Sequence, residues 1–102
     1  MSTFQHLSVN QLLHMQGSTA ELQIVDIRDA ASFAAGHIDT AFNLNNENIS
    51  HYIAEADMDQ PIIVVCYHGI SSQSAATFLN EQGFDDVYSL DGGYSAWHQA
   101  NA

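Results

Sequence analysis

The chain contains a single cysteine, and the residues around it have the types and spacing of a nucleophile at the end of a strand. Ile62–Val65 is a short, continuous apolar run of β-branched residues, as is typical of a central strand buried on both faces. Cys66 follows directly, and Gly69 then allows a sharp turn. Ser71 or Ser72 can act as the N-cap of a helix. The pattern predicts a strand, a tight loop that begins at the cysteine, and a helix.

A loop of this kind favours anions. Its backbone N–H groups and the N-terminus of the following helix point inward. A thiol at the rim of such a cradle should have a lowered pKa, which makes the thiolate a nucleophile near neutral pH. An anionic substrate can be held in the same place. Cys66 is therefore a candidate nucleophile, although composition alone would favour an inert buried thiol, since free cysteine is among the most buried residue types.

The other residues of the loop are candidates for binding the substrate. His68 is the nearest candidate cation, so it either helps to bind an anion or is an exposed loop residue. Tyr67 either shapes the rim of the site or only covers apolar surface. Backbone N–H groups, with added hydrogen bonds from serine hydroxyls, are expected from Gly69, Ile70, Ser71 and Ser72.

Strands alternate with helices along the whole chain, which predicts a parallel sheet covered on both faces. In open sheets of this class the ligand lies at the carboxyl ends of the strands, where Cys66, residues 26–28 and residues 91–93 are all expected. The expected strands are residues 22–26, 41–44, 62–65 and 87–90. The expected helices are residues 8–17, 30–35, 45–56, a helix from Ser71 or Ser72 that Gly83 stops, and a terminal helix after residues 91–93. Residues 1–6 are expected to be a lead-in.

Length, charge and cysteine usage limit the possible functions. The 102 residues suit a single domain, residues 1–102. The net charge of −11, with one arginine and no lysine, argues against nucleic acid and anionic membranes as partners. One cysteine allows no internal disulfide, and no leader or membrane-spanning stretch is apparent, so we expect a cytoplasmic protein. Cys66 and His68 supply two ligand types, but the other five histidines show no recognised ligand spacing, so no metal site is expected.

Three segments, in this order and at domain-sized spacing, form a combined signature. They are VDIRD at residues 25–29 with Phe33, GHI at 36–38 and AFNL at 41–44; CYHGISS at 66–72; and LDGGYSAW at 90–97. These segments resemble the N-terminal signature, the active-site loop and the C-terminal signature of the rhodaneses, the thiosulfate sulfurtransferases. The resemblance is closest to the short single-domain bacterial members, and it extends from about Leu7 to Trp97.

The resemblance implies an α/β fold, a rhodanese-like three-layer α/β/α domain with a central, mainly parallel five-stranded sheet. It also implies an enzyme that needs no cofactor. The Cys66 thiolate would attack the outer sulfur of thiosulfate or of a persulfide donor and keep that sulfur as a persulfide. Cyanide, or a thiol, dithiol or thioredoxin-like acceptor, would then remove it.

Some positions depart from the family pattern. Many sulfurtransferase loops carry an arginine or lysine in or just after the loop, whereas this chain has Ser71 and Gln73, so amide dipoles must attract the anion. Arg28, bracketed by Asp26 and Asp29, either reaches the substrate or, as we expect, makes a carboxylate pair that fixes loops at the sheet edge. The family often has a glutamate at the position of Ser32 that would pair with this arginine. Structural support is also expected from Asp91, as part of a turn that N-caps the last helix.

Two other functions remain open. A cysteine phosphatase or arsenate reductase shares the fold, but it needs a loop one residue longer that ends in an arginine, and no arginine follows Cys66. A non-catalytic binding or regulatory module is the second alternative, although rhodanese-like modules of that kind often lose the cysteine that this chain keeps.

Overall fold

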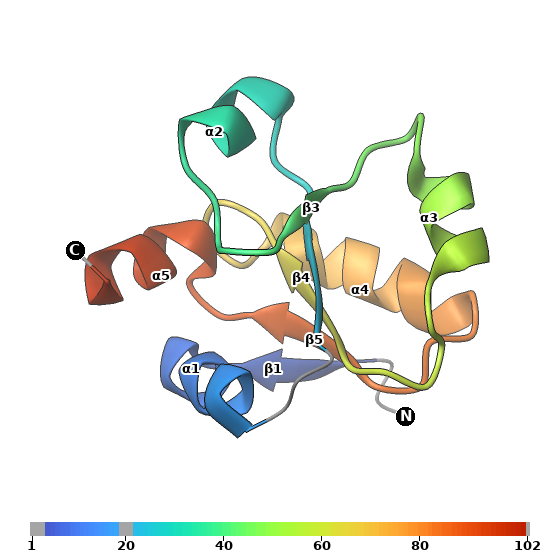
Figure 1. The fold of residues 1–102 in the computed structure, drawn as a ribbon, viewed down its shortest axis with the longest axis horizontal. Helices are drawn as coiled ribbons and strands as arrows, with labels where there is room; N and C mark the ends of the chain where they lie inside the picture. The colour runs from blue at the N-terminus through green and yellow to red at the C-terminus, as the bar shows by residue number, and fades with distance from the viewer. Residues whose placement is uncertain (1–3, 19–21, 102) are drawn as a thin grey trace.

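The computed structural model describes residues 4–18 and 22–101, and within them five strands form one sheet (Figure 1). The strand order is β1-β5-β4-β2-β3, and every neighbouring pair is parallel. In chain order the elements are β1 (Gln5–Leu7), α1 (Val9–Ser18), β2 (Gln23–Asp26), α2 (Ala30–Ala35), β3 (Phe42–Asn43), α3 (Ile49–Glu55), β4 (Ile62–Val65), α4 (Ser71–Glu81), β5 (Val87–Leu90) and α5 (Gly93–Ala100).

The central position of β4 follows from its apolar sequence. All four of its residues are buried, and the strand is paired on both edges, with Ile63 lying between Ile24 of β2 and Tyr88 of β5. A strand that is covered on both faces favours apolar side chains, because a polar side chain there needs a hydrogen-bond partner. Each such side chain contributes about 1.5–3 kcal/mol through burial. The strand that ends at Cys66 is therefore the best-anchored part of the sheet.

Each face of the sheet has its own core, because successive side chains of a strand point to opposite faces. Ile62 and Val64 pack with the cluster that includes Leu79 of α4 and, from α3, Tyr52. Ile63 and Val65 belong to a second cluster, which contains Leu12 of α1 and contacts Trp97 of α5. Figure 1 shows the helices in these two groups, with α2 beyond the ends of the strands. The result is the expected three-layer α/β/α arrangement.

The predicted elements are confirmed in order and type, but several boundaries differ. The lead-in expected at residues 1–6 is wrong at Gln5 and His6, which with Leu7 form the edge strand β1 beside β5. Only Leu7 in this strand is buried, so the segment lacks the apolar alternation by which strands are recognised. Two other elements are shorter than predicted, α3 at Ile49–Glu55 and β3 at Phe42–Asn43. The predicted lead-in also covers residues 1–3, which lie outside the described residues.

Two helix starts follow the sequence rules. The backbone N–H of Ser8 donates to Oε1 of Gln11 at 2.8 Å, and the N–H of Gln11 donates to Oγ of Ser8 at 3.1 Å, which forms a capping box before α1. Asp29 caps α2 by accepting the N–H of Ser32. None of the helices in the described ranges has the length and apolar character needed to cross a membrane.

Candidate active site

The loop between β4 and α4 encloses the sulfur of Cys66. Cys66 is only 4% exposed, and its Sγ accepts the backbone N–H of Gly69 at 3.1 Å and that of Ser72 at 3.3 Å. The hydroxyl oxygen of Ser72 lies 3.3 Å from the same sulfur. The loop thus directs three polar groups at one atom, as a cradle for a negative charge requires.

These hydrogen bonds decide the ionisation of the thiol. Burial raises the pKa of Cys66, but hydrogen bonds from the hydroxyl and N–H of Ser72 and from the N–H groups of Gly69 and His68 lower it by more. The pKa of Cys66 therefore lies below the ordinary thiol value. The geometry agrees with the predicted anion cradle and favours the ionised form of the thiol.

The loop keeps its shape by close packing against the turn that follows β5. Gly69 has φ +84°, and a Cβ there would lie 2.8 Å from the backbone nitrogen of Gly92. Gly93 has φ +61°, and a Cβ there would lie 2.4 Å from the carbonyl oxygen of Cys66. Both positions require glycine, since L side chains rarely adopt this conformation and no space is left for one. The second and third signature segments, CYHGISS and LDGGYSAW, therefore need glycine where they touch, although they are separate in sequence.

The N-terminus of α5 binds the start of the loop. The backbone N–H of Tyr94 donates to the carbonyl of Cys66 at 2.8 Å, and that of Ser95 donates to the carbonyl of Tyr67 at 3.1 Å. Two carbonyl groups of the loop are thereby satisfied by N–H groups at the start of a helix, which have no partner within the helix itself. The predicted convergence of the segments around Cys66, Asp26 and Asp91 on one sheet edge is confirmed.

Arg28 is not part of the anion cradle. Its guanidinium forms a two-pronged ion pair with Asp26, through Nη2 at 2.8 Å and Nε at 3.0 Å and 3.1 Å, and Nη2 also donates to the carbonyl of Gly36 at 2.7 Å. The guanidinium also lies 4.0 Å from the ring centroid of Tyr94. The residue is 7% exposed; burial lowers its pKa, but the interactions with Asp26, Tyr94 and Tyr67 together raise it by more. The predicted structural carboxylate pair is confirmed with Asp26.

Asp29 has a different partner from the one expected. Its carboxylate caps α2 and accepts the phenolic O–H of Tyr67, whose oxygen also lies 2.7 Å from Oγ of Ser32. The hydrogen bond from Tyr67 is the largest cause that lowers the pKa of Asp29 to about 2. Tyr67 is 45% exposed, yet its phenolic oxygen is held by Asp29 and Ser32. Tyr67 therefore forms a wall at the rim of the loop.

Comparison with known proteins now identifies the family. The Rhodanese-like domain family matches residues 8–100. This chain belongs to that family. It is 71% identical over 102 residues to a Shewanella oneidensis protein named thiosulfate sulfurtransferase GlpE, with 100% of each chain covered. A Pseudomonas aeruginosa protein of the same name is 50% identical over 95 residues, covering 93% of this chain and 84% of that one.

Solved structures agree on the rhodanese-like fold. A rhodanese-like domain protein from Staphylococcus aureus superposes with a TM-score of 0.81 at 23% identity, covering 92% of this chain and 91% of that one. A Rhodopseudomonas palustris protein described as a possible tyrosine phosphatase has a TM-score of 0.82 at 24% identity, covering 98% of this chain and 83% of that one. At these identities the likeness shows the fold alone.

The remaining residues of the rhodanese-like loop separate into exposed and buried groups. The exposed group contains Tyr67, His68, Ile70 and Ser71. Ile70 is 73% exposed, more than the other large hydrophobic side chains on the described surface. The prediction that Ser71 or Ser72 caps α4 is wrong, because Ile70 is the N-cap and makes no side-chain capping bond. Ser72 lies inside the first turn of α4, and its hydroxyl oxygen lies 3.3 Å from the sulfur.

A buried hydroxyl behind Ser72 escaped the sequence analysis. Oγ of Ser89, on β5, lies 2.7 Å from Oγ of Ser72, and neither side chain is exposed. The available signal was a polar residue inside the otherwise apolar run that ends β5, where a hydroxyl requires a partner. The partner, Ser72, is 17 residues away in the sequence, so local spacing does not identify it.

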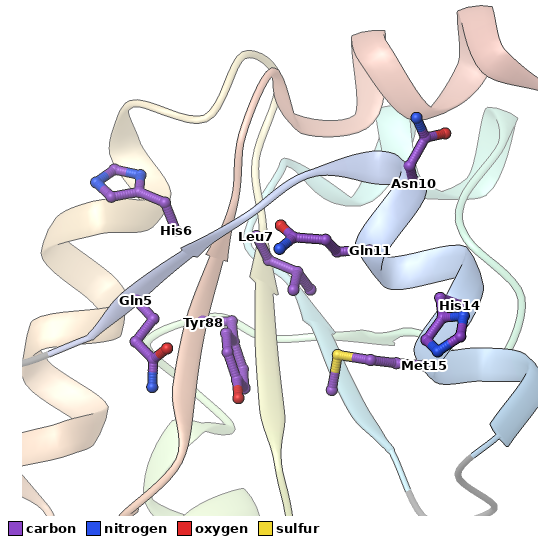
Figure 2. A pocket seen from close by; sticks show the side chains of 8 residues that line it. All are labelled: Gln5, His6, Leu7, Asn10, Gln11, His14, Met15 and Tyr88. Carbon is purple, nitrogen blue, oxygen red and sulfur yellow. The ribbon is translucent and has the colours of Figure 1, made fainter.

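A separate pocket of about 470 Å³ lies between β1 and α1 (Figure 2). None of the residues Cys66 to Ser72 lines it. His6, one of its lining residues, connects it to the turn before α5 through a 2.7 Å hydrogen bond between Nδ1 and Oδ1 of Asp91. The predicted turn at residues 91–93 does begin α5, with Gly92 as the N-cap, but no side chain caps the helix and the Asp91 carboxylate bonds to His6 instead. The lining residues are Gln5, His6, Leu7, Asn10, Gln11, His14, Met15 and Tyr88.

Proposed function

We propose that this chain is a thiosulfate sulfurtransferase in which Cys66 is the nucleophile and carries the transferred sulfur. The observation that supports the proposal most directly is the sulfur of Cys66 in its cradle, with N–H groups of Gly69 and Ser72 at 3.1 Å and 3.3 Å. The 71% identity to a protein named thiosulfate sulfurtransferase over the whole chain points to the same reaction.

In the first half of the reaction the Cys66 thiolate attacks the outer sulfur of thiosulfate. A bond forms between Sγ and that sulfur, the sulfur–sulfur bond of thiosulfate breaks, and sulfite leaves with its electron pair. The attack needs the ionised thiol, and the lowered pKa of Cys66 raises the thiolate fraction at neutral pH. The N–H groups of the loop stabilise the anionic persulfide that remains.

In the second half an acceptor removes the outer sulfur. A nucleophile such as cyanide, or the thiolate of a thiol, dithiol or thioredoxin-like protein, attacks the outer sulfur, and the Cys66 thiolate leaves. The chain has one cysteine, so it offers no second thiol that could resolve the persulfide. The acceptor must therefore come from outside, and the partly exposed rim at Tyr67, His68 and Ile70 is where it would approach.

The loop binds its anionic donor mainly through backbone dipoles. The one arginine is held by Asp26, so in our proposal Gly69, Ile70, Ser71 and Ser72 contribute N–H groups, while Tyr67 and His68 form the rim. Asp26, Arg28 and the His6–Asp91 bond support the surrounding turns. In this arrangement backbone N–H groups bind a small anion without help from positively charged side chains. The proposed binding residues are Tyr67, His68, Gly69, Ile70, Ser71 and Ser72.

Single-domain organisation and a reducing compartment complete the proposal. One sheet joins elements from Gln5 to Leu90, and one family match spans residues 8–100, as expected for a single rhodanese-like domain. The reaction needs Cys66 as a free thiol, which the cytoplasm maintains. We propose the cytoplasm as the site of action.

The experiment that tests the function is intact mass spectrometry after incubation with thiosulfate, with and without cyanide. We expect a gain of one sulfur atom that cyanide removes and that Cys66→Ala lacks. An unchanged mass, while Cys66 still reacts with an alkylating agent, would refute thiosulfate as the donor. Incubation with a low-molecular-weight persulfide would then distinguish a different donor from a non-catalytic module, which would gain no sulfur from either compound. Hydrolysis of an aryl phosphate would instead favour the phosphatase alternative.

A further inference from the structure

We propose that Ser89 is a positioning residue for Cys66, which acts through Ser72. In this arrangement the Ser89 hydroxyl donates to the Ser72 oxygen, and the Ser72 hydroxyl then donates to the thiolate. The inference rests on the proposed role of Cys66 as the nucleophile. It assigns a function to a side chain that lies on another strand and does not touch the sulfur.

The geometry forms a continuous line of three polar atoms. The sulfur of Cys66 lies 3.3 Å from Oγ of Ser72, which lies 2.7 Å from Oγ of Ser89. Both serines are fully buried and Cys66 is almost so. Ser72 belongs to the first turn of α4 and Ser89 to β5, so the line joins the loop to the sheet. Within the described part of the chain, the Ser89 hydroxyl forms its hydrogen bond with Ser72.

The ionised sulfur determines the direction of the hydrogen bonds. A thiolate has no proton and can only accept, so the single proton of Ser72 must point at Cys66 for the hydroxyl to stabilise the charge. The oxygen of Ser72 then has free lone pairs facing Ser89, and only a donated proton from Ser89 satisfies them. When Cys66 is a thiol, both bonds can reverse, with the thiol donating to Ser72 and Ser72 donating to Ser89. The two hydroxyls only reorient, and the proton of Cys66 goes to water.

The position of Ser89 in β5 supports a role beyond packing. Its neighbours Val87 and Leu90 are buried, and an apolar side chain at residue 89 would suit this environment without needing a partner. A buried hydroxyl is tolerated when it is hydrogen-bonded, and here the bonded partner is the residue that contacts the nucleophile. Hydrogen bonds in a chain polarise one another, so Ser89 strengthens the bond from Ser72 to the thiolate.

The test is the pH dependence of Cys66 alkylation by iodoacetamide, a neutral reagent, followed together with thiolate absorbance. We expect Ser89→Ala to raise the midpoint by about half a pKa unit, since each bond in such a chain is strengthened by roughly 10–30%. Below the midpoint, alkylation should then be about threefold slower, because one pKa unit is a tenfold change in the thiolate fraction. Ser72→Ala should raise the midpoint by more, because it removes the donor itself.

A double-mutant cycle separates positioning from general loosening of the fold. In the Ser72→Ala background, Ser89→Ala should cause no further shift, since the residue through which Ser89 acts is gone. Val87→Ala is the matched control: it removes buried side-chain volume from the same strand, and should lower Tm while leaving the alkylation midpoint unchanged. Ser89→Gly, which also lacks the hydroxyl, provides the same test if Ser89→Ala does not fold.

Three results would overturn the inference. The first is an unchanged alkylation midpoint in folded Ser89→Ala. The second is a midpoint shift from Ser89→Ala that is equally large with and without the Ser72 hydroxyl. The third is a midpoint shift in Val87→Ala as large as that in Ser89→Ala. These readouts do not depend on sulfur transfer. A protein that takes no sulfur from any donor would contradict the proposed function while leaving the Ser89 result interpretable.

Discussion

The contact between Gly93 and the active loop allows a quantitative prediction for Gly93→Ala. A Cβ at this position would lie 2.4 Å from the carbonyl oxygen of Cys66 and 2.6 Å from the carbonyl carbon of Tyr67. These are backbone atoms of a loop held between β4 and α4, so they cannot rotate away as the end of a flexible side chain would. The methyl group must separate α5 from the loop.

The expected loss of stability comes from two sources. Alanine at φ +61° costs about 1–2 kcal/mol from the left-handed backbone conformation alone. Separation also weakens the hydrogen bonds from the N–H groups of Tyr94 and Ser95 to the loop, each worth about 0.5–1.5 kcal/mol. Together these terms give about 2–5 kcal/mol, a large share of the roughly 5–15 kcal/mol expected for a domain of this size. We therefore expect Tm to fall by at least about 10 °C.

Gly17→Ala is the matched control for this glycine replacement. Gly17 lies in α1, has no atom within 4 Å of a built Cβ, and should gain up to about 1 kcal/mol from the better helix propensity of alanine. Thermal denaturation followed by circular dichroism gives Tm, and the alkylation midpoint of Cys66 reports on the loop. We expect Gly93→Ala to lower Tm and raise the midpoint, and Gly17→Ala to do neither. A Gly93→Ala protein that melts and ionises like the wild type would refute the packing argument.

Other measurable consequences follow from the ion pairs and pKa values. Tyr67→Phe removes the main cause of the lowered Asp29 pKa, so an NMR titration of the carboxyl group should move from about 2 toward the ordinary 3.8; no movement would contradict the assigned bond. Arg28→Ala leaves the buried carboxylate of Asp26 unpaired and should lower the free energy of unfolding by about 3–5 kcal/mol in urea denaturation, whereas a loss below ~1 kcal/mol would indicate a solvated pair. Because the folded state lowers the pKa of Cys66, the ionised thiol adds stability that is present above the ordinary value of 9.0 and lost as pH falls through the folded-state pKa; the Tm difference between wild type and Cys66→Ser should therefore increase with pH over this interval, and a constant difference would argue against a lowered pKa. Finally, kcat/KM for thiosulfate should rise with moderate salt, because the net charge of −11 repels a dianion and salt screens this repulsion beyond a Debye length of about 8–10 Å; a steep fall would reveal a cationic binding site.

Local patterns were sufficient for most of the fold. The apolar run at β4 and the alternation of strands and helices are short-range properties, and the structure confirms both. Strand β1 was missed because its partner is β5, more than eighty residues away, and a three-residue edge strand with one buried side chain has no periodicity of its own. Tertiary pairing alone makes this segment a strand.

The sequence by itself determined the chemistry of this protein: one cysteine directly after a buried strand, a loop that supplies N–H groups, and an arginine two residues from its carboxylate partner. Tertiary structure decided how that chemistry is supported. It placed Ser89 behind Ser72, Gly93 against the carbonyl of Cys66, and the phenol of Tyr67 on Asp29, a residue 38 positions away. These contacts join different elements of the parallel sheet, so they depend on strand order and register, and no local spacing in the sequence encodes them.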